Sequence, residues 1–210
     1  MKEKLVSKIT EEILAFTEAR PVPVAISNRH IHLSKDAKEV LFGSKPLSVM
    51  RKLGQPGEYA AQETVRLFGP KGHFDKVRVV GPERAHTQVE LTISDCYHLG
   101  IRPVIRLSGD IEETPGLYVV GPAGFLKLEN GVIVAQRHIH MSCKDAEKFG
   151  VRDLQKVRIR FNSGFRKGIL GDVLVRVAKN ASLECHLDVE EANALGIKNG
   201  DVVFMETGGI

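Results

Sequence analysis

A chain of 210 residues can form one large domain or two small ones, each with a modest core. Its formal charge of +4 suits an anionic partner, but it has no Trp, only three Tyr and no long basic run, so a small anionic substrate is favoured over nucleic acid. Three cysteines form no CxxC motif, and no signal peptide or long apolar segment is seen, so we expect a cytoplasmic protein that does not enter membranes.

The first predicted element is an amphipathic helix over residues 1–20. Its apolar residues recur at helical spacing among Lys and Glu, and Pro21 and Pro23 end the pattern. We expect this helix to pack on its own chain or on a second copy, with targeting as the alternative.

Beyond the helix, the apolar pattern becomes short and alternating, which is typical of β-strands. Turn residues, including several Gly-Pro pairs, separate the runs. The predicted strands are 22–26, 64–68, 76–80, 89–93, 104–107, 132–135, 156–161, 173–178 and 202–205. Many short strands with few short helices predict a mainly β fold built from small barrels or sandwiches.

The tetrapeptide Arg-His-Ile-His occurs at residues 29–32 and again at 137–140, and it takes four of the eight histidines. Residues two apart on a strand point to the same side, so each copy presents a pair of imidazoles with the Ile turned into apolar packing. The pairs are His30 with His32 and His138 with His140. Two imidazoles on one face form part of a metal site.

A short helix is predicted directly after each histidine pair. Ser34 and Ser142 are the predicted N-caps, and Gly43 and Gly150 are the predicted helix ends. Each histidine pair should therefore lie where a strand meets a helix.

A second match between the halves supplies a third ligand to each pair. Glu90 and His186 occupy equivalent places on the polar faces of two strands in which apolar and polar residues alternate. The sequence offset between them is 186 − 90 = 96, whereas the offset between the histidine pairs is 138 − 30 = 108. The candidate metal ligands are His30, His32 and Glu90 in one group and His138, His140 and His186 in the other. Three protein ligands with a free position are typical of catalytic zinc. The alternative is that hydrogen bonds within a sheet satisfy these histidines.

Offsets of about a hundred residues indicate an internal duplication into two domains of ordinary size. We predict two small β-barrel domains with short capping helices, over residues 21–125 and 126–210, after the helix of residues 1–20.

Several stretches taken together resemble one family. They are SNRHIHL at 27–33, QPGE at 55–58, GPER at 81–84, TQVE at 87–90, SGD at 108–110, RHIHM at 137–141, HLD at 186–188 and EANA at 191–194. Over essentially its whole length the chain resembles the phosphate acyltransferases of the propanediol-utilisation type (PduL-like).

The resemblance implies that acyl-CoA, propanoyl-CoA or acetyl-CoA, reacts with phosphate to give acyl phosphate and CoA on a pair of β-barrels. It implies two zinc ions per chain, held by the six ligands named above, and an essential arginine at Arg84. It also implies that the first strand, near residues 22–28, completes the C-terminal barrel. A homodimer is expected, in the free cytoplasm or inside a bacterial microcompartment.

Two cysteines depart from the family pattern. Cys143 stands where proline is usual, and Cys185 stands where Met is common. By strand alternation Cys185 should be buried on the apolar face. Cys143 begins a helix beside His140, so a reactive or metal-binding role stays open beside a purely structural one.

The sequence favours direct attack by phosphate on the thioester within a ternary complex, because no Ser or Cys accompanies a base in a nucleophile motif. The planar fork of Arg84 suits phosphate, with Arg29, Arg106 and Arg137 as further candidates. The alternatives are a dinuclear zinc hydrolase of thioesters or phosphoesters, and a zinc-stabilised regulatory or nucleic-acid-binding module.

Overall fold

The computed structural model describes residues 20–162 and 165–207. The helix predicted for residues 1–20 therefore lies outside the described residues, except that Arg20 begins the first strand. The chain divides into two compact units, each with its own hydrophobic core. Of the described residues, the barrel unit comprises 20–26, 137–162, 165–187 and 191–207, and the sheet unit comprises 27–136 with 188–190.

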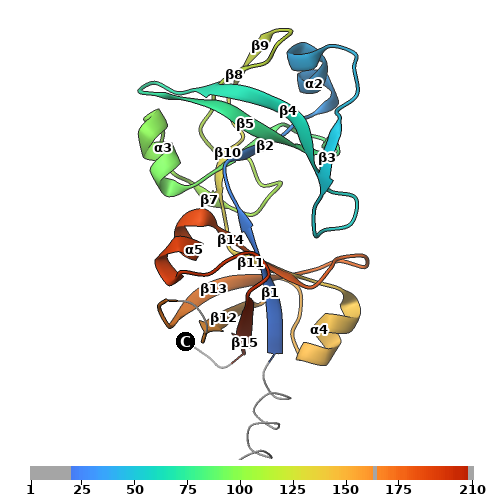
Figure 1. Cartoon of the computed structure of the whole chain (residues 1–210), viewed down its shortest axis with the longest axis vertical. Coiled ribbons are helices and arrows are strands. Elements are labelled where there is room, and N and C mark those ends of the chain that lie inside the picture. The colour runs from blue at the N-terminus through green and yellow to red at the C-terminus, as the bar shows by residue number, and fades with distance from the viewer. Residues whose placement is uncertain (1–19, 163–164, 208–210) are drawn as a thin grey trace, which may run out of the picture. The chain divides into compact units, whose positions relative to one another are not determined.

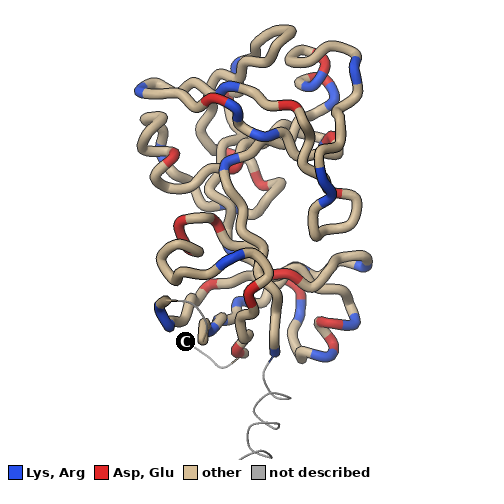
Figure 2. The backbone as a smooth tube through the Cα atoms, viewed as in Figure 1, with Lys and Arg blue, Asp and Glu red and all other residues tan. Residues whose placement is uncertain are grey.

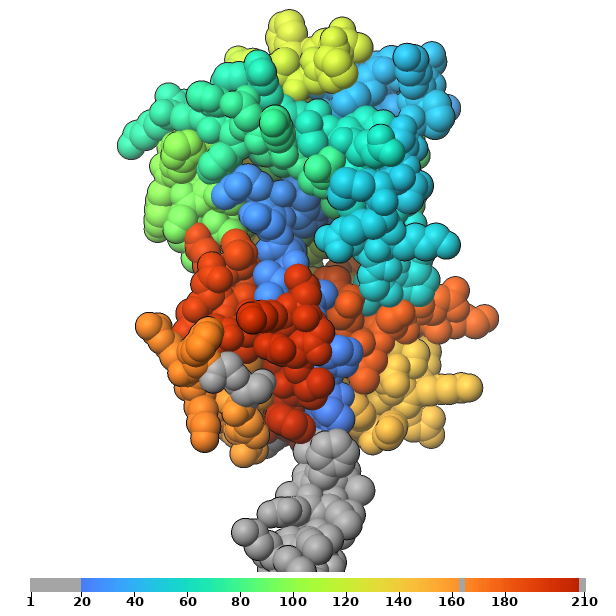
Figure 3. All heavy atoms as spheres, viewed as in Figure 1, coloured from blue at the N-terminus to red at the C-terminus, as the bar shows by residue number. Residues whose placement is uncertain are grey.

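The barrel unit is a closed barrel of six strands in the order β1-β14-β11-β13-β12-β15. Strand β1 pairs antiparallel with β15, with Val22 opposite Val203, so the earliest described strand lies beside the last one; Figure 3 shows their blue and red atoms side by side. Its elements are β1 (Arg20–Ser27), β11 (His138–Met141), α4 (Cys143–Phe149), β12 (Lys156–Phe161), β13 (Gly168–Val177), β14 (Glu184–Asp188), α5 (Val189–Leu195) and β15 (Val202–Glu206).

The sheet unit is built on one curled, nine-stranded sheet in the order β7-β10-β6-β2-β5-β4-β8-β9, with β3 paired to β4 (Figure 1). Its elements are β2 (His30–His32), α2 (Lys35–Phe42), β3 (Val49–Lys52), β4 (Tyr59–Phe68), β5 (His73–Gly81), β6 (Gln88–Leu91), α3 (Ile93–Leu99), β7 (Ile105–Arg106), β8 (Leu117–Val120), β9 (Phe125–Leu128) and β10 (Val132–Ala135).

The predicted helix caps after the two histidine pairs are confirmed. The Ser34 hydroxyl accepts the Ala37 N–H at the start of α2, and the Ser142 hydroxyl accepts the Asp145 N–H at the start of α4. Gly43 and Gly150 end these helices with φ of 75° and 64°, values that glycine adopts without a steric penalty.

The predicted mainly β class with two barrel-like domains is confirmed. The sequence pattern missed β3, β8 and β9; all four residues of β3 are exposed, so that strand has no alternation of buried and exposed positions to detect. The strand predicted over 89–93 ends at Leu91, because Thr92 caps helix α3. The predicted domain bounds stay a prediction.

Charged residues of both signs are interspersed along the described backbone of each unit, as Figure 2 shows. No described helix combines the length and the apolar character needed to cross a membrane.

Candidate metal centres

Three predicted ligands meet on the paired strands β2 and β6 of the sheet unit. His30 lies directly opposite Glu90 in the antiparallel register. The Nε2 atoms of His30 and His32 are 3.2 Å apart, and the Glu90 carboxylate oxygens lie 3.5 Å from His30 Nε2 and 3.7 Å from His32 Nε2. The three side chains are mostly buried. The structure therefore brings together this sheet-unit group as the sequence predicted.

Backbone carbonyls fix the orientation of both imidazoles. His30 Nδ1 lies 2.8 Å from the Asn28 carbonyl, and His32 Nδ1 lies 3.1 Å from the Val80 carbonyl. A neutral imidazole that donates its Nδ1–H to a carbonyl keeps a lone pair on Nε2. An imidazole whose Nδ1–H is bound to a carbonyl while Nε2 stays available is the arrangement seen in metal-binding histidines.

The protonation states also suit a metal ion. Burial, together with the neighbouring His30, lowers the pKa of His32 to about 3, so this imidazole is neutral at physiological pH. Burial opposes ionisation of Glu90, but His30, His32 and Arg84 together hold its pKa below the usual value. Neutral imidazoles and an ionised carboxylate are the forms that coordinate metals.

The spacing of the donor atoms fits zinc. Bonds of about 2.0–2.1 Å in a tetrahedron place neighbouring donors about 3.4 Å apart. The 3.2 Å between the two Nε2 atoms lies near this value, and each Nε2 atom lies 3.5 or 3.7 Å from one of the two Glu90 oxygens.

A second group forms on the paired strands β11 and β14 of the barrel unit. His138 lies opposite His186, and the Nε2 atoms of His138 and His140 are 3.1 Å apart. One nitrogen from each of His138, His140 and His186 lies within 4.8 Å of the others. This barrel-unit group is again the triplet that the repeat predicted, and the spacing of its His138 and His140 nitrogens is close to a tetrahedral edge.

A carboxylate that the sequence did not single out adjoins the barrel-unit group. The Glu184 Oε2 atom lies 2.8 Å from His186 Nε2. Glu184 precedes His186 by two residues and so shares its face of the strand. The same parity would have identified it from the sequence.

Arg84 is connected to Glu90 through one hydroxyl. Its Nη1 donates to Ser108 Oγ at 2.8 Å, and Ser108 Oγ donates to Glu90 Oε1 at 3.0 Å. Its Nη2 forms an ion pair with Glu58 Oε1 at 3.0 Å. The side chain is 31% exposed, so it can still receive an anion from solvent. Glu58 and Ser108 lie in two of the stretches that carry the family resemblance, but their contacts with Arg84 join distant segments and were not predicted.

Two of the further candidate arginines, like Arg84, form ion pairs with carboxylates. Arg29 binds Asp95 with Nη2 2.8 Å from Oδ1, and its guanidinium lies 4.3 Å above the Phe74 ring. Arg137 binds Glu191 at 3.0 Å. Since 191 − 95 = 96, the two ion pairs are equivalent in the duplication. Each ion pair connects the segment that carries a histidine pair to the helix that follows the third candidate ligand of the same group.

The remaining predicted residues are placed as follows. Arg106 lies 3.5 Å from Asp110. Cys185 is fully buried in the barrel core, which confirms its prediction, and burial raises the pKa of its thiol. Cys143 is exposed at the start of α4 and belongs to neither metal-ligating group of the described residues.

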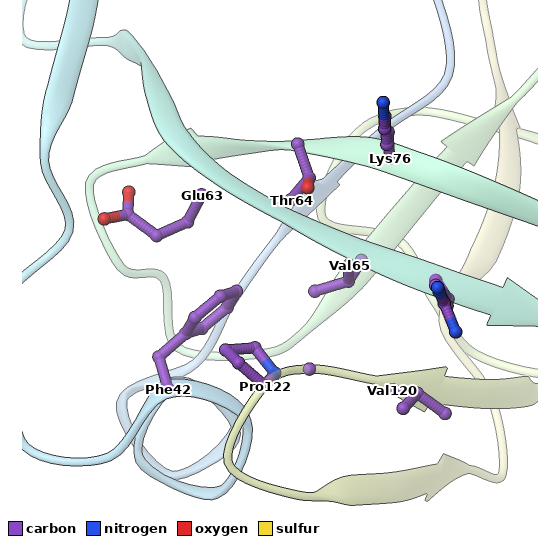
Figure 4. A pocket seen from close by; sticks show the side chains of 9 residues that line it. Phe42, Glu63, Thr64, Val65, Lys76, Val120 and Pro122 are labelled. Atoms are coloured by element: carbon purple, nitrogen blue, oxygen red, sulfur yellow. The ribbon is translucent and has the colours of Figure 1, made fainter.

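A surface hollow of about 580 Å³ in the sheet unit lies between β4, β5 and the β8–β9 turn. Figure 4 shows the rings of Phe42 and Pro122 close together on one side of it, with Lys76 on the other. None of the candidate ligands lines this hollow, so it is separate from the sheet-unit group.

Comparisons with known proteins agree with the resemblance. A family model described as phosphate propanoyltransferase matches residues 23–198. A phosphate propanoyltransferase of Thermotoga maritima is 46% identical over 202 residues, which is 96% of each chain. A phosphate propanoyltransferase of Rhodopseudomonas palustris is 50% identical over 183 residues, which cover 87% of this chain and 80% of that relative. A third, of Shewanella putrefaciens, is 42% identical over 97% of this chain and 96% of that relative.

Proposed function

Because the chain belongs to the phosphate propanoyltransferase family, we propose that it converts an acyl-CoA and inorganic phosphate to an acyl phosphate and CoA, and the reverse. Propanoyl-CoA and acetyl-CoA are the proposed substrates. The observation that carries this proposal is the convergence of three donors on each of two equivalent strand pairs. Arg84 is connected to one of these donors, Glu90, through two hydrogen bonds to Ser108.

The proposed metal is zinc, one ion in each group. His30, His32 and Glu90 would hold one ion, and His138, His140 and His186 the other. Zinc bound in such sites supplies a Lewis acid that stabilises negative charge on an acyl oxygen or on a thiolate sulfur.

Arg84 is the proposed phosphate-binding residue. Its guanidinium presents a planar fork that matches two phosphate oxygens, and it is partly exposed. Glu58 and Ser108 hold the fork in one orientation, which reduces the entropy lost when phosphate binds. A phosphate held there lies in the same hydrogen-bonded network as Glu90.

The proposed chemical step is direct attack by a phosphate oxygen on the thioester carbonyl carbon. A C–O bond forms, the C–S bond breaks, and the electron pair leaves with the CoA sulfur. No thiol of the protein needs to take part: burial raises the pKa of the Cys96 thiol to about 12, and Cys143 lies outside both metal-ligating groups of the described chain. The side chains thus support positioning and charge stabilisation rather than a covalent intermediate.

The test is CoA release from propanoyl-CoA and acetyl-CoA by protein of known zinc content, with and without phosphate. We expect release only with phosphate, and its loss in His138→Ala. His73→Ala is the matched control, since His73 is exposed at the start of β5 and belongs to neither metal-ligating group. Release without phosphate would instead support a zinc hydrolase, which the three-donor groups also favour because open zinc sites activate water.

On the family resemblance we also propose a homodimer that acts in the cytoplasm or inside a bacterial microcompartment. Light scattering coupled to size exclusion tests the dimer, and a mass equal to one chain would contradict it.

A further inference from the structure

Gln88 is a buried amide that holds Glu90 in the sheet unit. It lies on β6 two residues before Glu90, so both side chains project from the same face of the strand. Gln88 is 2% exposed, and its Nε2 donates to Glu90 Oε1 at 2.7 Å and to Ser108 Oγ at 2.8 Å. Its own Oε1 accepts the Gly109 N–H at 2.7 Å. Both hydrogens and the oxygen of this amide are therefore engaged.

The Gly109 N–H fixes which way the amide points. A backbone N–H can only donate, so the Gln88 atom beside it is the oxygen, and the NH₂ group faces Glu90. A reversed amide would set its NH₂ group against the Gly109 donor and its oxygen against the Glu90 carboxylate. The direction of donation to Glu90 is thus determined by the loop that carries Gly109.

The two oxygens of Glu90 differ in their contacts. Oε1 accepts from Gln88 and also from the Ser108 hydroxyl, at 3.0 Å, and two hydrogen bonds occupy the two lone pairs of a carboxylate oxygen. This oxygen lies 3.7 Å from His32 Nε2. Oε2 lies 3.5 Å from His30 Nε2, close to the edge of about 3.4 Å between donors of a tetrahedral zinc site. The protein therefore holds one oxygen and leaves the other beside a ligand nitrogen.

The barrel unit has a different residue at the equivalent position. Glu184 corresponds to Gln88, since 184 − 88 = 96 is the offset that also relates Glu90 to His186. Glu184 Oε2 lies 2.8 Å from His186 Nε2. In both units the residue two positions before the third candidate ligand thus contacts that ligand, with an amide beside the carboxylate and a carboxylate beside the imidazole. The amide of Gln88 matches a carboxylate ligand, whose second oxygen has lone pairs to accept its N–H.

We propose that Gln88 is a positioning residue: with Ser108 it holds Oε1 of Glu90 and leaves Oε2 as the single oxygen that binds the sheet-unit metal ion. The inference rests on the proposed metal centres and adds how Glu90 binds. A carboxylate that binds through both oxygens takes two positions around an ion, whereas one that binds through Oε2 alone takes one. Gln88 thereby keeps a position on that ion free for substrate.

The variant Gln88→Met tests this role, because methionine has a similar length and donates no hydrogen bond. In cobalt-loaded protein, the released Oε1 should join Oε2 on the metal, and the visible absorption of that site should weaken as its coordination number rises. Loss of an outer-shell partner typically weakens metal binding by about 10- to 100-fold, so competition with a chromophoric chelator should show one weakened site and one unchanged site.

The matched control is Gln62→Met, which makes the same replacement at an exposed position of β4 in the same unit and should change neither the spectrum nor the affinities. An unchanged cobalt spectrum in Gln88→Met would overturn the proposal even with weaker binding, because Gln88 would then support the site without selecting the oxygen. Unchanged affinities would overturn it as well.

A second measurement uses the unaltered protein and so does not depend on how Gln88→Met folds. The infrared difference spectrum between zinc-loaded and zinc-free protein contains the carboxylate stretches that change when metal binds, and the bands that Glu90→Gln lacks belong to Glu90. The separation between the antisymmetric and symmetric stretches of Glu90 should increase on zinc binding, as it does when one oxygen binds. A decreased separation, which indicates two bound oxygens, or the absence of a Glu90 band would overturn the proposal.

Both measurements are made without acyl-CoA or phosphate. They can therefore fail while phosphate-dependent CoA release is observed, or succeed while it is not.

Discussion

The Ser108 hydroxyl joins Arg84 to Glu90, a member of the sheet-unit group. It accepts from Arg84 at 2.8 Å and from Gln88 at 2.8 Å, and it donates its single proton to Glu90. Two donors on one side and one acceptor on the other fix the direction of the O–H bond. The position of the Arg84 fork is therefore coupled to that of a proposed metal ligand.

Replacing Arg84 should damage catalysis much more than stability. Loss of one preorganised charge stabiliser typically costs about 10²- to 10³-fold in rate, so Arg84→Ala should reduce phosphate-dependent CoA release by about a hundredfold or more. Arg84→Lys retains the charge but lacks the fork, and should also be impaired. Initial rates at varied phosphate concentration measure the effect. Arg66→Ala, which removes an exposed arginine paired with Asp75, serves as the control. Near-normal rates for Arg84→Ala would remove this residue from the mechanism.

The three cysteines should differ sharply in reactivity. Cys96 and Cys185 are buried, and burial raises the pKa of both thiols, whereas Cys143 is exposed. Since the thiolate is the reactive form, iodoacetamide near pH 8 should label the native protein once, at Cys143, and the denatured protein at all three positions. Mass spectrometry of peptides gives the sites. The variant Cys143→Ala should retain turnover. If the variant is inactive and an acyl group can be trapped on Cys143 of the unaltered protein, a covalent route would replace direct attack by phosphate.

The ion pairs Arg29–Asp95 and Arg137–Glu191 tie elements together in the same way in both halves. In the sheet unit, Asp95 binds Arg29 beside strand β2 and also completes the capping box of α3 with Thr92. One buried carboxylate thus fixes the start of a helix and the segment that leads into a histidine pair. These ion pairs give the arginine that precedes each histidine pair a structural role.

Asp95→Asn should therefore destabilise the protein by more than the loss of a surface ion pair. A helix cap is worth about 1 kcal/mol, and hydrogen bonds to a charged group about 1.5–3 kcal/mol. Because Arg29 is 36% exposed, solvent screening places the expected loss at about 1–3 kcal/mol. Urea unfolding measures it. Asp75→Asn, which breaks the exposed pair with Arg66, should cost less than about 1 kcal/mol, and equal losses in the two variants would refute the structural role of Asp95.

The sequence predicted those features that depend on local pattern. Ser34 and Ser142 were identifiable as caps, and the i, i+2 histidine pairs as one-sided, because these relations span only a few residues. Contacts between segments far apart in the chain have no local sequence pattern from which they could be predicted. The pairing of β11 with β14 that sets Glu184 opposite His140, and the link from Arg84 through Ser108 to Glu90, depend on strand register and loop course, which composition and periodicity do not specify.

At the scale of the whole molecule, each compact unit has its own core and its own candidate metal group. The closed barrel needs β1, from the beginning of the described chain, to pair with β15 near its end. Strands from near both ends of the described chain thus form part of the barrel that holds His138, His140 and His186.

Removal of metal should lower both activity and thermal stability. A metal that binds only the folded state stabilises it by mass action, so chelation should decrease the melting temperature and abolish CoA release. Zinc should restore both, and magnesium should restore neither, because five of the six proposed donors are imidazoles. Unchanged turnover in protein with no measurable metal would contradict the proposed centres.

The most direct test of the proposed acyl transfer is ³¹P nuclear magnetic resonance of a mixture of zinc-loaded protein, propanoyl-CoA and inorganic phosphate. We predict that the phosphate signal decreases while an acyl phosphate signal appears in step with free CoA, and that neither change occurs with His138→Ala. An unchanged phosphate signal accompanied by free propanoate and CoA would contradict acyl transfer and establish thioester hydrolysis instead.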